Sequence, residues 1–337
     1  MERKMTIKMT NLKDEKGNPI KLNQPAFLVG NGINLADGCN ELKWNKLLSK
    51  VIFGTSDIDI EQEFKGLNYP EIAELAELYQ KNKTKKENIK IDPDKTIKKQ
   101  ICEEIIKREE AKNKNEISKL FVTFCRDNNI PVLTTNFDHR LLLSLDITKE
   151  KSKNFEKKMI ETPFWFLTKE EKLNNHLIPY RYPFRAYFAE DEIKPENIRN
   201  EFAVWHVHGT KRYIDSISIN YIDYARNIAE IDKMIRDKKQ IGTIWDERYS
   251  WIDIFMRNDL VIIGLGLDSS ETDIRWLLRE RHVYQELMNK DKLASTIYIY
   301  SKEEGIAAGK SKLFEALGIR CVPMAQDEIY VIEKYLK

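Results

Sequence analysis

Four short apolar runs in this chain each end in a turn made of glycine or small polar residues. The runs are 26–29, 130–133, 203–207 and 260–263. Runs of this length fit buried strands, and stretches with apolar residues at helical spacing lie between them. Two more strands are expected at 295–300 and near 319–322. Strands that alternate with helices predict an α/β fold, here a Rossmann-like, doubly wound and mostly parallel sheet.

The turns after these strands hold the residues that we expect to form a site. They are Gly30-Asn31-Gly32 with Asn34, then Thr134 to Asp138, then His208-Gly209, and finally Gly264 to Asp268. In a parallel sheet, ligands bind in the crevice outside the carboxyl ends of the strands. The shared position of the turns therefore predicts that residues far apart in the sequence converge on one pocket.

The two glycine turns also have a purely structural interpretation. Gly30 and Gly32 would let the backbone approach a phosphate, but Leu35 stands where a dinucleotide-binding fingerprint has its third glycine. Gly264 and Gly266 would serve equally well in an ordinary strand–helix connection. Neither turn identifies a ligand when it is taken alone.

The polar residues of the second and third turns are open to two interpretations as well. Asp138 is a plausible N-cap for the helix that follows it, but a cap leaves Asn136 unexplained. His208 lies where its strand ends and is expected to bury little surface. It is either a general base or orienting group, or a structural histidine. A metal pair with His206 is conceivable, but the sequence shows no third ligand.

Composition and charge argue against several classes of protein. Lys and Arg number 56 against 54 Asp and Glu, and this net charge of +2 argues against dedicated nucleic-acid binding. The four cysteines are scattered, which disfavours a zinc site or a disulfide framework and favours a cytoplasmic location. No apolar run is long enough to span a bilayer, so a membrane location is not expected.

The chain is expected to form one main domain with additions. The parts are an N-terminal arm (1–24) and a nucleotide-binding domain (25–337) that carries a helical insertion (55–128) and a loop-rich insertion (147–200). A Lys-rich run at 81–99 is expected to be a solvated loop. The helical insertion is expected to serve assembly or to gate the cleft, unless it merely covers one face of the sheet.

Taken together and in order, the motifs resemble those of the SIR2 (sirtuin-like) family. The matching elements are Gly30-x-Gly32 with Asn34 and Gly38, Trp44 in the next helix, Thr134-Thr135-Asn136-Phe137-Asp138, His208-Gly209, the segment to Tyr224, and Gly264-Leu265-Gly266-Leu267-Asp268 with Asp273-Ile274. Asn31 and Asn34 replace the alanine and serine of the sirtuin glycine motif, and the four-cysteine zinc module of protein deacylases is missing. The pattern is most similar to the zinc-less SIR2-like NADases of bacterial anti-phage defence.

This resemblance implies an enzyme that cleaves its substrate NAD with water into nicotinamide and ADP-ribose, without a metal, and depletes NAD during infection. Asn136 would hold the ribose or a water, His208 would act as the base, and Asp138 would orient the nicotinamide-ribose side. The resemblance also assigns two sets of NAD-binding residues. Gly30, Asn31, Gly32 and Asn34 would face the phosphates, and Gly264, Gly266 and Asp268 would lie near the adenosine half.

Two other functions remain open at the level of the sequence. One is an NAD-dependent protein deacylase, which the missing zinc module weakens. The other is a catalytically silent module that binds NAD or ADP-ribose and reports to a partner. Because uncontrolled NAD loss would kill the host, we expect a homo-oligomer. A companion ATPase or a phage-derived activator is a partner that the resemblance suggests.

Overall fold

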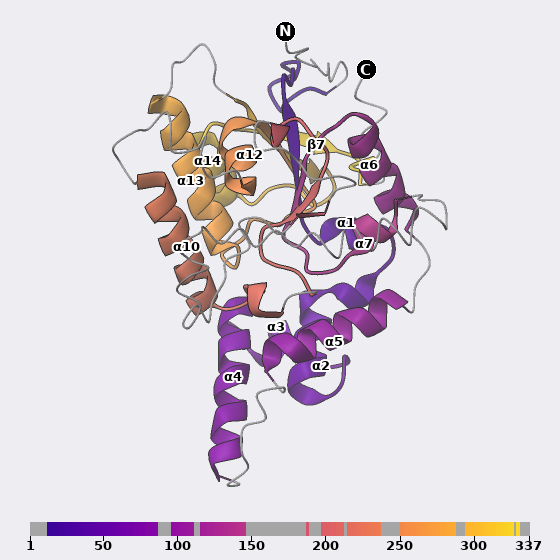
Figure 1. The fold of residues 1–337 in the computed structure, drawn as a ribbon, viewed down its shortest axis with the longest axis vertical. Coiled ribbons are helices and arrows are strands. Elements are labelled where there is room, and N and C mark those ends of the chain that lie inside the picture. The colour runs from indigo at the N-terminus through magenta and orange to yellow at the C-terminus, as the bar shows by residue number, and fades with distance from the viewer. Residues whose placement is uncertain are drawn as a thin grey trace, which may run out of the picture.

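A sheet of seven strands lies at the centre of the computed structural model (Figure 1). The structure describes residues 12–86, 96–110, 115–145, 187–188, 197–211, 214–236, 250–287, 294–326 and 328–330. The strands are β1 (Pro25–Val29), β2 (Val132–Thr134), β3 (Tyr187–Phe188), β4 (Val204–His206), β5 (Asp259–Ile263), β6 (Thr296–Ser301) and β7 (Ile319–Met324). Neighbouring strands are parallel except for the short β3, which pairs antiparallel with β4. The predicted α/β fold is confirmed.

The strand order, β3-β4-β2-β1-β5-β6-β7, reverses direction beside β1. The chain moves outward from β1 through β2 to β4, then returns to the other side of β1 and continues from β5 to β7. A reversal of this kind is the topological switch point at which open α/β sheets bind ligands. In the sheet, Val29 pairs with Thr134 and with Ile263, and Thr134 pairs with His206. The four strands therefore end at the same level, and their turns start side by side.

Helices cover both faces of the sheet. Along β1, Phe27 and Val29 belong to one hydrophobic core, whereas Ala26 and Leu28 belong to another. The first face carries α1 (Gly32–Ala36), α6 (Glu116–Asp127) and α7 (Arg140–Leu143), and the second carries α10 (Tyr221–Arg236), α12 (Trp251–Arg257), α13 (Thr272–Leu287) and α14 (Ala308–Ala316). Burial on both faces explains why the strands appear in the sequence as continuous apolar runs.

A third hydrophobic cluster lies beyond the strand ends. It is built from η1 (Asn40–Leu42), α2 (Trp44–Phe53), α3 (Ile60–Glu63), α4 (Tyr69–Lys86), α5 (Ile97–Glu110) and η4 (Ile214–Ser216). Leu48 and Ile101 of this cluster pack with Phe137 and Ile217 from the segments after β2 and β4. In Figure 1, α2 to α5 gather at the end of the molecule opposite β7. The helical insertion therefore stands over the edge at which the strands end.

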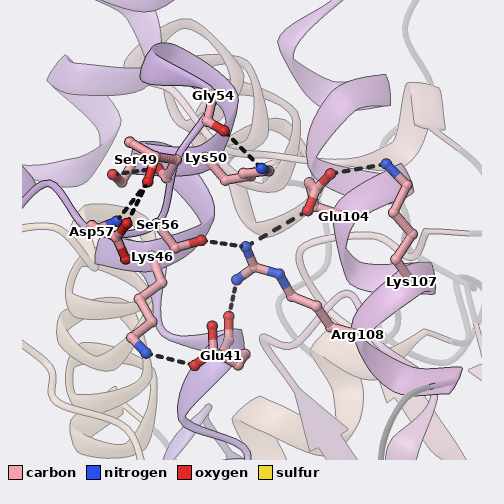
Figure 2. A network of polar contacts seen from close by, with 11 residues as sticks. Glu41, Lys46, Ser49, Lys50, Gly54, Ser56, Asp57, Glu104, Lys107 and Arg108 are labelled. Atoms are coloured by element: carbon pink, nitrogen blue, oxygen red, sulfur yellow. Dashed lines mark hydrogen bonds and ion pairs between the residues drawn. The ribbon is translucent and has the colours of Figure 1, made fainter.

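Arg108 ties the insertion helices to one another (Figure 2). Its guanidinium donates to the backbone carbonyl of Glu41 and, at 3.0 Å, to the Ser56 hydroxyl. It also lies 3.6 Å from the Glu104 carboxylate, and Lys46 forms an ion pair of 2.6 Å with Glu41. One side chain of α5 thus holds η1 and the loop after α2, which makes the insertion a fixed unit rather than a set of loosely attached helices.

The boundaries of the insertions differ from the sequence-based expectation. Helix α6 packs against the sheet and is not part of the insertion, because its Phe121 contacts Phe27 of β1 with ring centroids 5.2 Å apart. Helix α4 continues to Lys86, into the Lys-rich run that we expected to be a loop, and 87–95 lies outside the described residues. Of the loop-rich insertion, only 187–188 and 197–200 are described.

The N-terminal segment is part of the core from Leu12 onward. Leu12, Ile20 and Leu22 are buried in the same cluster as β1 and β5. The backbone N–H of Glu15 also donates to the carbonyl of Cys321 in β7, at 3.1 Å. Among the described residues, no helix combines the length and the apolar character needed to cross a membrane.

Two substitutions on α4 test the orientation of this helix. Ile72 is 1% exposed in the third cluster, whereas Leu78 on the same helix is 50% exposed. We expect Ile72→Asp to lower the free energy of unfolding by more than about 3 kcal/mol, because it buries a charge. Leu78→Asp, the matched control, should change it by less than about 0.5 kcal/mol. Denaturant unfolding measures both values, and equal losses would contradict the orientation.

Candidate active site

A pocket of about 170 Å³ opens where the four strands end. All four turns contribute to its lining, through Asn31, Asn136, His208 and Asp268 among others. The predicted convergence of the turns is therefore found in the structure. The opposite wall is apolar and aromatic: Leu42, Trp44 and Leu47 precede the predicted insertion, and Tyr69 and Ile105 lie within it. The insertion thus contributes side chains to this wall.

Asp138 joins the first and second turns. Its Oδ2 accepts a hydrogen bond of 2.7 Å from the Asn34 amide, and its Oδ1 accepts one of 3.0 Å from the backbone N–H of Arg140. Burial raises the pKa of Asp138, while these two hydrogen bonds act in the opposite direction. The N-cap of α7 is His139, not Asp138, although the Asp138 carboxylate does bind the first turn of this helix. Asp138 lines the pocket and holds Asn34 behind it.

Asn136 is held in the pocket wall by three contacts. Its side-chain amide donates to the Gly30 carbonyl at 3.2 Å, and its backbone N–H donates to the Thr134 hydroxyl at 3.1 Å. The ring Nδ1 of His206 binds the Asn136 carbonyl at 2.8 Å, and burial lowers the pKa of His206 to about 4. His206 is therefore a neutral histidine that positions the Asn136 turn. The Asn136 amide oxygen takes part in none of these contacts.

His208 forms a buried pair with Asp273 at the start of α13. Its Nε2 lies 3.0 Å from Oδ2 and 3.2 Å from Oδ1 of the carboxylate. Burial acts to lower the pKa of His208, but the charge and hydrogen bond of Asp273 together with the charge of Glu271 outweigh it, so the pKa lies above its ordinary value. Because Nε2 faces Asp273, Nδ1 is the ring nitrogen left for a ligand. The expectation of a little-buried side chain is wrong, since His208 is 3% exposed.

Gly209 allows the chain to turn sharply after His208. Its φ is +86°, a backbone conformation that favours glycine. A side chain there would also collide with the backbone of Ser216. The glycine that follows the histidine therefore has a structural reason that does not depend on any ligand.

Glu271 is a residue of the pocket that sequence analysis missed. Its side chain lines the pocket, and its Oε2 is buried without a partner among the described residues. Burial raises the pKa of Glu271 to about 7; the His208 ring acts against this rise, and Asp273 adds to it. The only signal in the sequence is its place between Asp268 and Asp273, in a segment where an acidic residue could equally have been a helix cap.

The His208 ring lies together with an acidic group, the carboxylates of Glu271 and Asp273. Their potential ligand atoms all lie within 4.8 Å of one another, close enough to hold a divalent metal ion. The potential metal ligands nearest to His208 are therefore Asp273 of α13 and Glu271 just before this helix, and not His206. The expectation that no metal is needed remains a prediction, and chelation tests it below.

The two glycine turns pack directly against each other. The N–H of Gly32 donates to the Gly264 carbonyl at 2.8 Å. A methyl group added to Gly30 would lie 2.5 Å from that carbonyl oxygen and 2.7 Å from Cα of Leu265. Their close contact gives both turns a structural reason for glycine. Of the predicted NAD-binding residues, Asn31, Gly266 and Asp268 line the pocket, whereas Gly30, Gly32, Asn34 and Gly264 do not.

Glu109 of the insertion holds two of the turns. Its carboxylate accepts a hydrogen bond of 2.6 Å from the backbone N–H of His139, after β2, and forms an ion pair with Lys211, after β4. The backbone N–H of Lys211 in turn donates to the Phe137 carbonyl at 3.0 Å. The positions of the second and third turns therefore depend on α5. Nothing in the sequence around Glu109 indicates this contact.

Comparison with known proteins adds no family assignment. No protein-family model matches the chain, and no curated protein matches it either. The likeness to SIR2 enzymes therefore rests on the residues of the four turns. These residues are judged below by the chemistry that their arrangement allows.

The pKa of Glu271 leads to a pH-dependent prediction. Because the pKa rises from 4.5 unfolded to about 7 folded, the folded state binds more protons over this window and loses stability as the pH rises. Glu271→Gln removes this loss. At about pH 8 the variant should be more stable than the wild type by up to about 3 kcal/mol, and at about pH 4 by close to nothing. Urea unfolding at both pH values measures this, and a variant destabilised at about pH 8 would contradict it.

Proposed function

We propose that this protein is a SIR2-like NAD glycohydrolase, which converts NAD and water to nicotinamide and ADP-ribose. The observation that carries the proposal is the joint placement of Asn136 and His208 in one pocket at the switch point of a doubly wound sheet, with Asp273 bound to His208. Dinucleotides bind at such switch points. The order of the motifs along the chain adds the resemblance to SIR2 enzymes.

The reaction breaks the bond between nicotinamide nitrogen and ribose C1′. Both electrons of this bond leave with nicotinamide, the ribose develops oxocarbenium character, and a water oxygen forms the new bond to C1′. Nδ1 of His208 would take the proton from this water or from a ribose hydroxyl, and Asp273 would stabilise the imidazolium, as a buried carboxylate does in a catalytic triad. The Asn136 amide oxygen would accept a hydrogen bond from the ribose or the water.

The other pocket residues would bind and orient NAD. Asp268 is exposed at the pocket and would accept hydrogen bonds from ribose hydroxyls, as acidic residues do in dinucleotide-binding folds. Asp138 would act through Asn34 by fixing the first turn against the second. A Glu271 carboxylate would stabilise positive charge on the reacting ribose. The backbone of the glycine turns would run beside the phosphates.

A role in anti-phage defence follows from the same resemblance. The four cysteines are all buried and form no disulfide: two lie in the third hydrophobic cluster and one in each core of the sheet. They cannot form the zinc module of protein deacylases, so the deacylase reading loses support. We further propose that the protein acts in the cytoplasm as a homo-oligomer. A companion ATPase or a phage-derived activator would start NAD cleavage.

Variants of His208 and Asn136 test the catalytic proposal. We expect His208→Gln and Asn136→Ala each to lower the rate of nicotinamide release by about 10²–10⁴-fold, because they remove the base and the ribose-holding amide. Glutamine is preferred to alanine at 208, since alanine would remove the histidine partner of the buried Asp273 carboxylate and leave it only the backbone N–H of Ile274 among its known contacts.

The control is the exposed Ser269→Ala, which should keep full activity. Thermal melting checks that each variant folds. Full activity of folded His208→Gln would overturn the base assignment. A wild type that binds NAD but releases no nicotinamide would favour the catalytically silent module.

Chelation tests whether the acidic group beside His208 binds a metal. If His208 is the base, EDTA should leave nicotinamide release unchanged, because the imidazole pairs with Asp273 and needs no ion. The rate is measured before and after dialysis against EDTA, with zinc, magnesium or manganese added back. Loss of activity that one metal restores would show instead that His208, Glu271 and Asp273 are ligands.

A further inference from the structure

The space beside the Cα atoms of Gly32 and Gly264, here called the crevice, is occupied by the side chain of Tyr330. A methyl group added to Gly32 would lie 2.5 Å from the Tyr330 hydroxyl oxygen, and one added to Gly264 would lie closer still. Tyr330 follows β7 and is 7% exposed, in the same hydrophobic cluster as Val29 and Ile263 at the ends of β1 and β5. The hydroxyl thus touches the backbone of both turns at the switch point.

Tyr330 does not line the catalytic pocket, although Leu265 and Gly266 of the second glycine turn do. A dinucleotide at a switch point places its pyrophosphate against the glycine backbone, because glycine lets the chain approach the phosphates closely. At Gly32 and Gly264 that space is filled by the tyrosine hydroxyl.

We propose that Tyr330 is an autoinhibitory plug, which closes the phosphate end of the site while the catalytic end stays open. The proposal rests on the proposed function, since it takes NAD as the ligand of this crevice. Binding of a dinucleotide then requires displacement of Tyr330 from the glycine turns. The apparent affinity for the ligand is then the intrinsic affinity multiplied by the fraction of molecules in which the crevice is free.

Tyr330 lies in the turn that follows β7, the last strand of the sheet. Its backbone makes a local turn, in which the N–H of Glu328 donates to the Ala325 carbonyl at 2.9 Å. Ile329 and Tyr330 supply its buried apolar surface. Because Tyr330 lies outside the strands and does not line the catalytic pocket, its displacement would leave the register of the sheet unchanged.

Binding of ADP, which has a pyrophosphate but no scissile bond, tests the plug without catalysis. We expect Tyr330→Ala to bind ADP at least about tenfold more tightly than the wild type in calorimetry, because the crevice is then free. Tyr300→Ala, the matched control, removes a tyrosine of β6 whose hydroxyl binds Glu15 and should leave ADP affinity unchanged. If Tyr330→Ala does not fold, Tyr330→Leu takes its place, since leucine fills the core but ends short of the glycine turns.

Hydrogen exchange of the wild type gives a second readout. With ADP-ribose bound, peptides covering 319–330 should exchange faster, whereas peptides of β1 should not. A folded Tyr330 variant that binds ADP no better than the wild type overturns the proposal. Weaker binding also overturns it, and shows that the hydroxyl is instead a phosphate ligand.

Nicotinamide release separates failure of the plug from failure of the proposed function. If the Tyr330 variant binds ADP more tightly but neither it nor the wild type cleaves NAD, the plug proposal is supported and the glycohydrolase proposal is contradicted. If the wild type cleaves NAD and the variant has an unchanged KM, the glycohydrolase stands and the plug does not.

Discussion

Parallel pairing of β1 with β2 and β5, and of β2 with β4, is the constraint on which the site depends. This register brings Val29, Thr134, His206 and Ile263 to one level. The four turns therefore begin side by side, although the first and the last are more than two hundred residues apart in the sequence. Each turn then needs only a few residues to reach the pocket. The polar groups sit on rigid strand ends, which is the arrangement that holds reacting groups in a fixed geometry.

The helices of the third hydrophobic cluster, η1 and α2 to α5, form the other side of the pocket. They supply the apolar wall of the pocket, and Arg108 fixes them to one another. Glu109 then fixes them to the turns after β2 and β4. A pocket with an apolar wall and a few convergent polar groups is typical of small-molecule sites. The site therefore belongs to two parts of the chain at once, a sheet edge and a helical unit that does not share its core.

The sequence was sufficient to predict the fold and part of the site. Apolar runs that end in turns located the main strands, and Asn136, Asp138 and His208 were found because their turns share one structural position. Glu271 and Glu109 were not found, because a glutamate in a helical or capping context looks like any solvated acid until its partner is known. The same holds for Tyr330, whose meeting with Gly32 joins residues about three hundred positions apart. Such contacts are set by tertiary packing, which leaves no local pattern.

The contact of Glu109 with both neighbouring turns makes these turns one cooperative unit. A carboxylate that binds the backbone of His139 and the ammonium of Lys211 cannot release one without weakening its hold on the other. Energetic effects of changes in the two turns are therefore coupled and do not add. The turns that carry Asn136 and His208 are thus anchored to the same residue of α5. A substitution that moves one of these turns is therefore expected to change the position of the other as well.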